Sequence, residues 1–182
     1  MKSAFGIFAS ILLFCACTQP EKEYRAESYF DVPAFFDSEV SRLTTLGVKL
    51  VKTTRVSDKS DSLEITIPNW KRELALFRKV NLNVPALAGK YQITKEFSDS
   101  LNTTRYVLPE GMNGTVELRI SENAKGNIQR LECRIVETST LTTHTEYWTY
   151  IPDSGYAYAG SDRIRGISSN TYFISGRFVV PK

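Results

Sequence analysis

The sequence predicts an α+β domain in which a curved antiparallel β-sheet of about seven to nine strands is covered by two helices. Three observations lead to this fold class. Segments 31–46 and 69–80 carry apolar residues at helical spacing. Most of the remaining chain alternates apolar and polar residues at a period of two, which is typical of half-buried strands. Short polar turns separate the alternating runs, and short turns connect antiparallel rather than parallel neighbours.

The first predicted helix runs over residues 31–46. Its apolar stripe, spaced by four, four and three residues, consists of Val32, Phe36, Val40 and Leu43. Asp31 is a suitable N-cap, and Gly47 stands where a glycine commonly ends a helix. The second predicted helix, 69–80, begins at the N-cap Asn69 and carries the stripe Trp70, Leu74 and Phe77. Both stripes need an apolar partner.

The predicted strands fall into two groups. The first is a hairpin between the two helices, with strands 48–56 and 63–67 around the polar turn 57–61. The second is a series of runs bounded by turn residues, at 90–97, 103–108, 115–121, 127–137, 141–151, 155–161 and 171–180. Their short connections predict a meander. Since no linker or repeat interrupts them, residues 29–182 are expected to form a single α+β domain.

Composition limits the possible functions. The chain has 182 residues, of which 42% are hydrophobic and 24% charged, as in an ordinary globular domain. The formal charge is only +3, and the chain lacks the clustered basic residues of a nucleic-acid-binding protein. No nucleic-acid partner is therefore expected. The one histidine and three cysteines do not stand in the paired spacing of a structural zinc site. Neither a metal nor a cofactor is predicted.

The N-terminus resembles the export signal of a bacterial lipoprotein. Lys2 supplies a positive start, and the mostly apolar run 4–16 is shorter than the ~20 residues that span a bilayer. Ala16 precedes Cys17, as the small residue of a lipobox precedes its lipidated cysteine, although Phe14 stands where Leu is usual. The resemblance implies a signal peptide over 1–16, lipidation of Cys17 and a tether over 17–28. An ordinary cleaved signal peptide is the alternative.

A lipidated Cys17 would hold the protein on a membrane, because several acyl chains together anchor stably. No Asp follows Cys17 directly, which resembles lipoproteins of the outer membrane rather than those retained at the inner membrane. The predicted location is therefore the cell envelope, anchored in the outer membrane, with a lipid or another envelope protein as a possible partner. Cys133 would then lack a disulfide partner and is expected to be a small buried residue.

No catalytic set is evident, and the protein is not expected to be an enzyme. His144 lies among threonines on a predicted strand, where bonding to neighbouring hydroxyls is expected. A hydrolase would need Asp or Glu to converge on His144 in a cleft. No acid–base pair can be assigned among Glu132, Glu137 and Glu146, because the distances between them depend on strand register. The sequence also lacks a nucleophile elbow and a phosphate loop.

Aromatic residues suggest two competing functions. Trp148 and Tyr150 share one face of a predicted strand. In one hypothesis they join Trp70 and Phe77 around a cavity that binds a lipid or acyl chain. In the other, these residues fill the core, and the protein is a structural or interaction lipoprotein without a small-molecule ligand. Periodicity cannot separate the two, because a residue that faces a core and one that faces a cavity recur at the same spacing.

The segment Trp70 to Phe77, continued by 81–91, resembles a segment common in lipoproteins of the Bacteroidota to which no activity is assigned. A lipid anchor followed by a helix and a curved sheet is also similar to the lipoprotein-carrier folds of the periplasm. That resemblance implies a concave apolar cavity for acyl chains.

Two Asp-Ser-Leu tripeptides, 61–63 and 99–101, match the Asp-Ser/Thr-aliphatic pattern of O-glycosylation in exported Bacteroidota proteins. They make Ser62 and Ser100 candidate glycosylation sites, both expected in loops.

Overall fold

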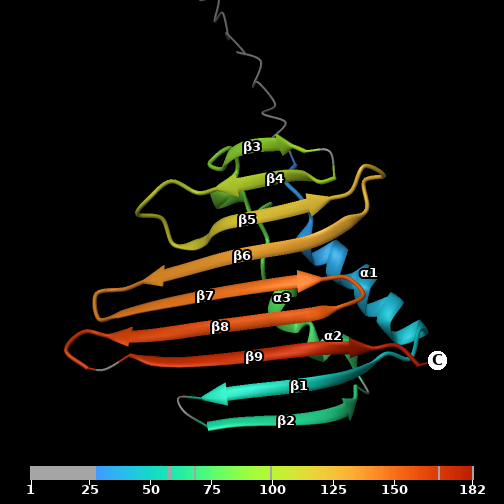
Figure 1. Ribbon diagram of the computed structural model, residues 1–182. Coiled ribbons are helices and arrows are strands. Elements are labelled where there is room, and N and C mark those ends of the chain that lie inside the picture. Colours follow the sequence, from blue (N-terminus) through green and yellow to red (C-terminus); the bar gives the residue numbers. More distant parts are fainter. Residues whose placement is uncertain (1–27, 57–58, 68, 99, 168, 182) are drawn as a thin grey trace, which may run out of the picture.

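The computed structural model describes residues 28–181, apart from positions 57–58, 68, 99 and 168. It is an α+β fold with one open antiparallel sheet, as the sequence predicts (Figure 1). The described residues form nine strands in the order β2-β1-β9-β8-β7-β6-β5-β4-β3. The predicted signal peptide, Cys17 and nearly all of the tether lie outside the described residues.

Most strands follow the predicted runs, but β2 begins at Lys59, within the predicted turn 57–61, because residues 59–61 pair with β1. Strands β3 to β9 form the expected meander, and the β1–β2 hairpin extends the sheet by pairing β1 with β9. The strands are β1 Lys49–Val56, β2 Lys59–Thr66, β3 Gln92–Phe97, β4 Asn102–Val107, β5 Gly114–Glu122, β6 Ile128–Thr138, β7 Thr142–Ile151, β8 Gly155–Ile164 and β9 Asn170–Val179. The pairing of β1 with β9 joins segments that are far apart in the chain.

The predicted first helix is confirmed as α1, Val32–Thr45. Its N-cap is Asp31, whose carboxylate accepts a hydrogen bond of 2.9 Å from the backbone N–H of Ala34. Gly47, with a φ of +58°, follows the helix in the left-handed conformation that glycine adopts without strain. The cap and the terminal glycine therefore set the two ends of α1.

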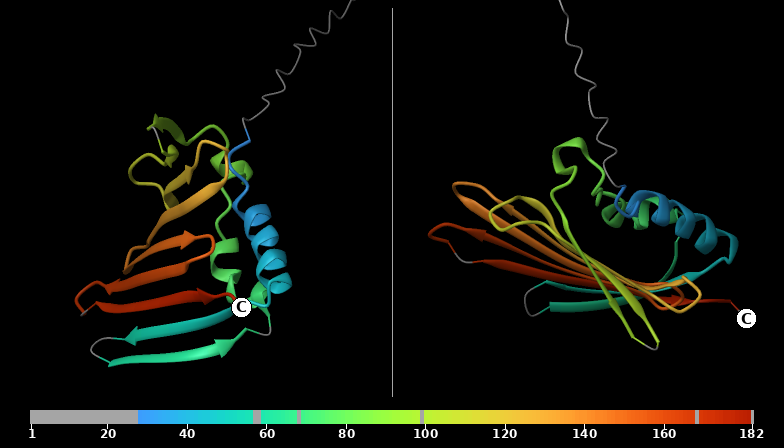
Figure 2. Two further views of the ribbon diagram at one scale, coloured as in Figure 1. Left: turned by 45° about the vertical axis from the view of Figure 1, so that its right-hand side comes forward. Right: turned by 90° about the horizontal axis from the view of Figure 1, so that it is seen from above.

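The second predicted helix is wrong in its length. Residues 69–80 instead form two single-turn helices, α2 Trp70–Glu73 and α3 Ala75–Arg78, joined at Leu74. The predicted cap is present, since Asn69 accepts from the N–H of Arg72. Helices this short take their geometry from packing rather than from propensity. The sheet is thus not covered by two helices as expected: α1, α2 and α3 lie on one of its faces (Figure 2), and the 3-10 turn Pro85–Leu87 follows.

The face of the sheet toward the helices, here called the inner face, carries an aromatic core of Phe36, Phe77, Trp148 and Tyr150. Phe36 of α1 stacks on Phe77 of α3 with 5.3 Å between ring centroids. Trp148 lies edge-on to Phe77 at 5.2 Å, and Tyr150 lies edge-on to Phe36 at 4.9 Å. Such pairs contribute about 0.5–1.5 kcal/mol each beyond the area they bury. The aromatic core therefore joins α1, α3 and β7.

A buried acidic residue fastens α1 to the sheet. Glu39 is 6% exposed, and its carboxylate accepts two hydrogen bonds from Arg42, at 2.8 and 2.7 Å. The Tyr150 hydroxyl donates a third, at 2.5 Å. Arg42 also contacts Asp153 in the turn after β7, at 2.5 Å. Burial, together with the Glu39 carboxylate, raises the pKa of Tyr150, so its hydroxyl remains a proton donor.

Two glycines inside strands admit aromatic rings from neighbouring strands. A Cβ on Gly160 of β8 would lie 2.2 Å from the ring of Tyr172, and one on Gly176 of β9 would lie 2.5 Å from the ring of Tyr156. Both distances are far below van der Waals contact. Each glycine therefore provides the space in which a tyrosine of the adjacent strand lies across the sheet.

Replacing Phe77 by Ala should lower the free energy of unfolding by about 3–5 kcal/mol, because it removes the ring that contacts three others in the aromatic core. Phe97→Ala is the matched control: Phe97 is 77% exposed, so its loss should cost less than about 0.5 kcal/mol. Urea denaturation measures both values. Equal destabilisation by the two variants would contradict the packing described here.

Candidate functional site

The four residues predicted to line an apolar cavity belong to the packed interior. Trp70, Phe77, Trp148 and Tyr150 are each at most 3% exposed. Three of them form the aromatic core with Phe36, and Trp70 packs edge-on against Phe178 with 5.6 Å between ring centroids. Phe77, Trp148 and Tyr150 contact one another or Phe36, and Phe178 lies between Trp70 and Tyr150. Their arrangement is the one expected of residues that fill a core.

A cluster of charged residues lies on the same inner face, along β7 and β8. The polar cluster consists of His144, Glu146 and Asp162. His144 Nδ1 lies 2.5 Å from an Asp162 oxygen, and His144 Nε2 lies 2.7 Å from a Glu146 oxygen. The expectation that His144 bonds to neighbouring threonine hydroxyls is wrong. Thr143 and Thr145 alternate with it along β7 and therefore project from the opposite face.

The two carboxylates favour the protonated form of His144. Hydrogen bonds to Glu146 and then to Asp162 raise the pKa of His144 above its usual range. An imidazolium that donates from both nitrogens has no lone pair with which to accept a proton. Carboxylates thus converge on His144, as the enzyme hypothesis required, and the protonated ring would donate a hydrogen bond to each of them.

A pocket borders the polar cluster. It lies between the inner face of β5–β7 and the chain from α3 to the 3-10 turn, and it has a volume of about 330 Å³. We call it the connector pocket. Its apolar lining consists of Leu76, Val80, Leu87 and Ile135. Its polar lining includes Lys79, Asn81, Glu137, His144 and Glu146. The volume falls within the range of small-molecule sites, which begins at about 300 Å³.

Sequence reasoning considered two residues of this site separately but did not predict the site. His144 and Glu146 stand two residues apart in an alternating run, so a shared face was readable. Asp162 was missed, because its position opposite His144 depends on the register of β7 against β8. The connector residues Leu76 and Val80 were missed because the interrupted second helix changes which side chains face the sheet.

The other candidate residues have simpler surroundings. Cys133 is 4% exposed, and burial raises the pKa of its thiol, so it is the inert small residue that the sequence predicts. Ser100 is exposed in the turn between β3 and β4. The expectation of a loop at Ser62 is wrong, since this residue lies within β2. Ser62 and Ser100 remain predicted glycosylation sites.

Two kinds of feature are absent from the described residues. In residues 28–181 with the stated gaps, no group of three or more His, Cys, Asp or Glu side chains is arranged to hold a metal ion. In the same part of the chain, no helix has both the length and the apolar character needed to cross a bilayer.

Comparisons with models of protein families, with curated proteins and with solved structures find no match to this chain. The resemblance to Bacteroidota lipoproteins therefore stays a prediction from the N-terminal segment and residues 70–91.

The polar cluster should make stability depend on pH. Because the pKa of His144 is raised in the folded state, its contribution is fully present below the unfolded value of about 6.5 and is lost as pH rises through the folded pKa. His144→Gln should therefore destabilise the protein more at pH 6 than at pH 9 in urea titrations.

Asp162→Asn should weaken the same pH dependence, because it removes one of the two carboxylates that hold the imidazolium. Asp153→Asn is the matched control, since Asp153 pairs with Arg42 and not with His144. A His144→Gln effect that is constant from pH 6 to pH 9 would contradict the charged cluster.

Proposed function

We propose that this protein is a lipid-anchored protein of the outer membrane whose domain binds an apolar ligand, such as a lipid or an acyl chain, without catalysing a reaction. The observation that carries the binding proposal is the connector pocket. The lipobox-like segment that ends at Cys17 supports the anchor and the location. Cys17 lies outside the described residues, so its lipidation rests on the sequence.

The lining of the connector pocket suits an amphiphile. Leu76, Val80 and Leu87 form an apolar wall on the connector side, and Ile135 adds an aliphatic side chain from β6. An acyl chain that displaces water from this wall gains about 25 cal/mol for each Å² of apolar area removed from water. Glu137 and Glu146 offer acceptors to a polar head group that donates hydrogen bonds. Phe77 and Trp148 are buried in the aromatic core and do not line this pocket.

The alternative is a structural or interaction lipoprotein without a small-molecule ligand. The tight packing of the aromatic core favours it, since this hypothesis predicts a filled interior. The two proposals differ in the connector pocket, which holds a ligand in one and water in the other.

A Cys17→Ser chain exported to the periplasm should carry extractable lipid. Native mass spectrometry would show an added mass, and lipid extraction would identify it. Leu76→Trp should reduce the fraction of protein that carries the added mass, because the larger ring occupies part of the connector pocket. Leu141→Trp should not, because Leu141 is 66% exposed in the turn before β7. A bare mass after incubation with phospholipids and fatty acids would favour the interaction lipoprotein.

The anchor is tested separately by labelled palmitate in cells that express the full chain. Cys17→Ser should eliminate incorporation, because the acyl groups are attached at this residue. Cys15→Ser and Cys133→Ser should retain it. Absence of label from the unaltered chain would instead indicate an ordinary cleaved signal peptide.

A further inference from the structure

The face of the sheet opposite the helices, here called the open face, carries an ordered row of side chains. The strand register aligns Arg55 of β1, Phe173 of β9, Ala159 of β8, Tyr147 of β7 and Arg134 of β6. These five residues form the open-face row. The row runs across the strands, with an arginine at each end, an aromatic ring inside each arginine and the smallest side chain at the centre.

The centre of this row is a slot between two aromatic rings. Phe173 and Tyr147 stand two strands apart, and strand spacing of about 4.8 Å places them about 10 Å from each other. Ala159 between them leaves the space above β8 open. Both rings reach solvent, with Tyr147 50% and Phe173 36% exposed. The pocket here has a volume of about 360 Å³, and its lining includes the hydroxyls of Thr145, Ser161 and Thr171.

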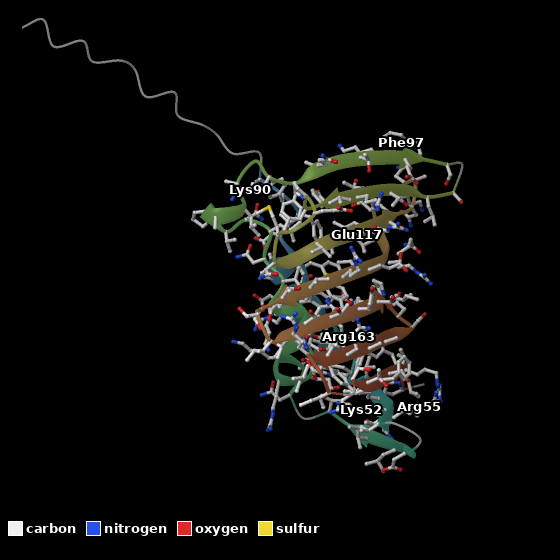
Figure 3. All side chains as sticks on the ribbon, turned by 90° about the vertical axis from the view of Figure 1, so that its left-hand side faces the viewer. Lys52, Arg55, Lys90, Phe97, Glu117 and Arg163 are labelled. Carbon is white, nitrogen blue, oxygen red and sulfur yellow. The ribbon has the colours of Figure 1, made fainter. Side chains whose placement is uncertain are left out.

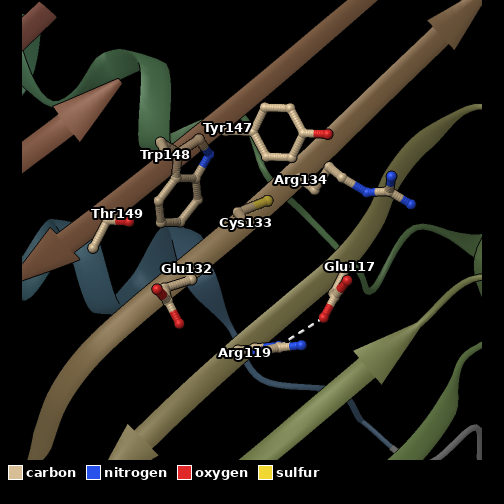
Figure 4. Close-up of a pocket in the computed structure, with 8 residues that line it drawn as sticks. All are labelled: Glu117, Arg119, Glu132, Cys133, Arg134, Tyr147, Trp148 and Thr149. Carbon is tan, nitrogen blue, oxygen red and sulfur yellow. Dashed lines mark hydrogen bonds and ion pairs between the residues drawn. The ribbon is translucent and has the colours of Figure 1, made fainter. Parts of the chain in front are cut away.

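Within the part of the chain that the structure describes, the two arginines of the row have no ionic partner. Neither Arg55 nor Arg134 forms a hydrogen bond or ion pair through its side chain with another residue in the described part of the chain. Arg55 extends on the side of the sheet away from the helices (Figure 3). Arg134 and Tyr147 project side by side from neighbouring strands (Figure 4).

Two described carboxylates on the open face near Arg134, Glu117 and Glu132, are engaged by other arginines. Glu117 accepts from both Arg105 and Arg119 at 2.7 Å, and these bonds lower the pKa of Glu117. Glu132 pairs with Arg130 at 3.2 Å. The positive charges of Arg55 and Arg134 are therefore available to an external anion.

We propose that the open-face row binds an acidic saccharide, with a sugar ring between Phe173 and Tyr147 and its carboxylate or phosphate groups against Arg55 and Arg134. The C–H face of a sugar ring is apolar and stacks on aromatic rings, while its hydroxyls exchange hydrogen bonds with Thr145, Ser161 and Thr171. The planar guanidinium of arginine suits bidentate contact with carboxylate or phosphate.

Other occupants fit the row less well. A bilayer would require apolar side chains spread over the whole face, whereas the two rings are confined to one slot. An extended peptide would add to a sheet edge, and this row crosses the middle of the sheet. The saccharide site is separate from the connector pocket, which lies on the inner face.

Calorimetric titration of the Cys17→Ser chain tests this site, since that chain cannot insert acyl groups into vesicles. The probes are tetragalacturonate, a phosphorylated oligomannose and neutral maltotetraose. At least one acidic saccharide should bind more tightly than maltotetraose, and its affinity should fall with added salt. Tyr147→Ala and Arg134→Gln should each weaken it about tenfold. Arg72→Gln is the matched control, because Arg72 is exposed on α2 at the other face.

Three results would overturn the proposal: no binding of either acidic saccharide, equal binding of maltotetraose, or binding that Tyr147→Ala and Arg134→Gln leave unchanged. Tighter binding to phosphatidylglycerol vesicles than to both acidic saccharides would assign the face to a lipid surface instead. Leu76→Trp should leave saccharide binding intact, so failure of the lipid proposal and failure of this one are distinguishable. Circular dichroism of each variant verifies that the fold is retained.

Discussion

The stacking of Phe36 on Phe77, with Trp148 and Tyr150 edge-on to these rings, is the contact on which the arrangement of the molecule depends. It joins α1, α3 and β7 in one buried cluster. Because α1 and the two short helices bury their apolar residues on the inner face, they leave the opposite face without a helical cover (Figure 2). Along β7, the aromatic core gives way to the polar cluster and the connector pocket.

Ionic groups serve different purposes on the two faces. On the inner face, Glu39 pairs with Arg42, and Glu73 pairs with Lys52 at 2.8 Å while accepting from Tyr156. Removal of one member of such a pair would leave a charge with little access to water, which strongly destabilises a fold. These pairs therefore hold helices on the sheet. On the open face, by contrast, Arg55 and Arg134 are solvent-accessible and available for a ligand.

Local patterns predicted much of the fold correctly. Asp31, the apolar stripe and Gly47 indicated α1 nearly to the residue, because caps and periodicity are local properties. Alternation indicated most of the strands and placed Trp148 and Tyr150 on one face of β7. The same reasoning failed for residues 69–80. Trp70 packs against Phe178 and Phe77 packs against Trp148, and the helix is interrupted at Leu74 between them. Periodicity was present there, but tertiary contacts decided the length of the helices.

The sequence by itself determined most of the strands, the side of a strand on which their residues lie, and where the first helix begins and ends; the start of β2 was not among them. Only the tertiary structure decided which residues are neighbours across strands. Asp162 meets His144, and Tyr147 stands beside Arg134, through hydrogen-bonded registers between separate strands. The physical reason is that alternation assigns a side chain to a face without specifying its partner. A shift of one residue in a register would move a strand's side chains to the other face. The polar cluster and the open-face row would then both be lost.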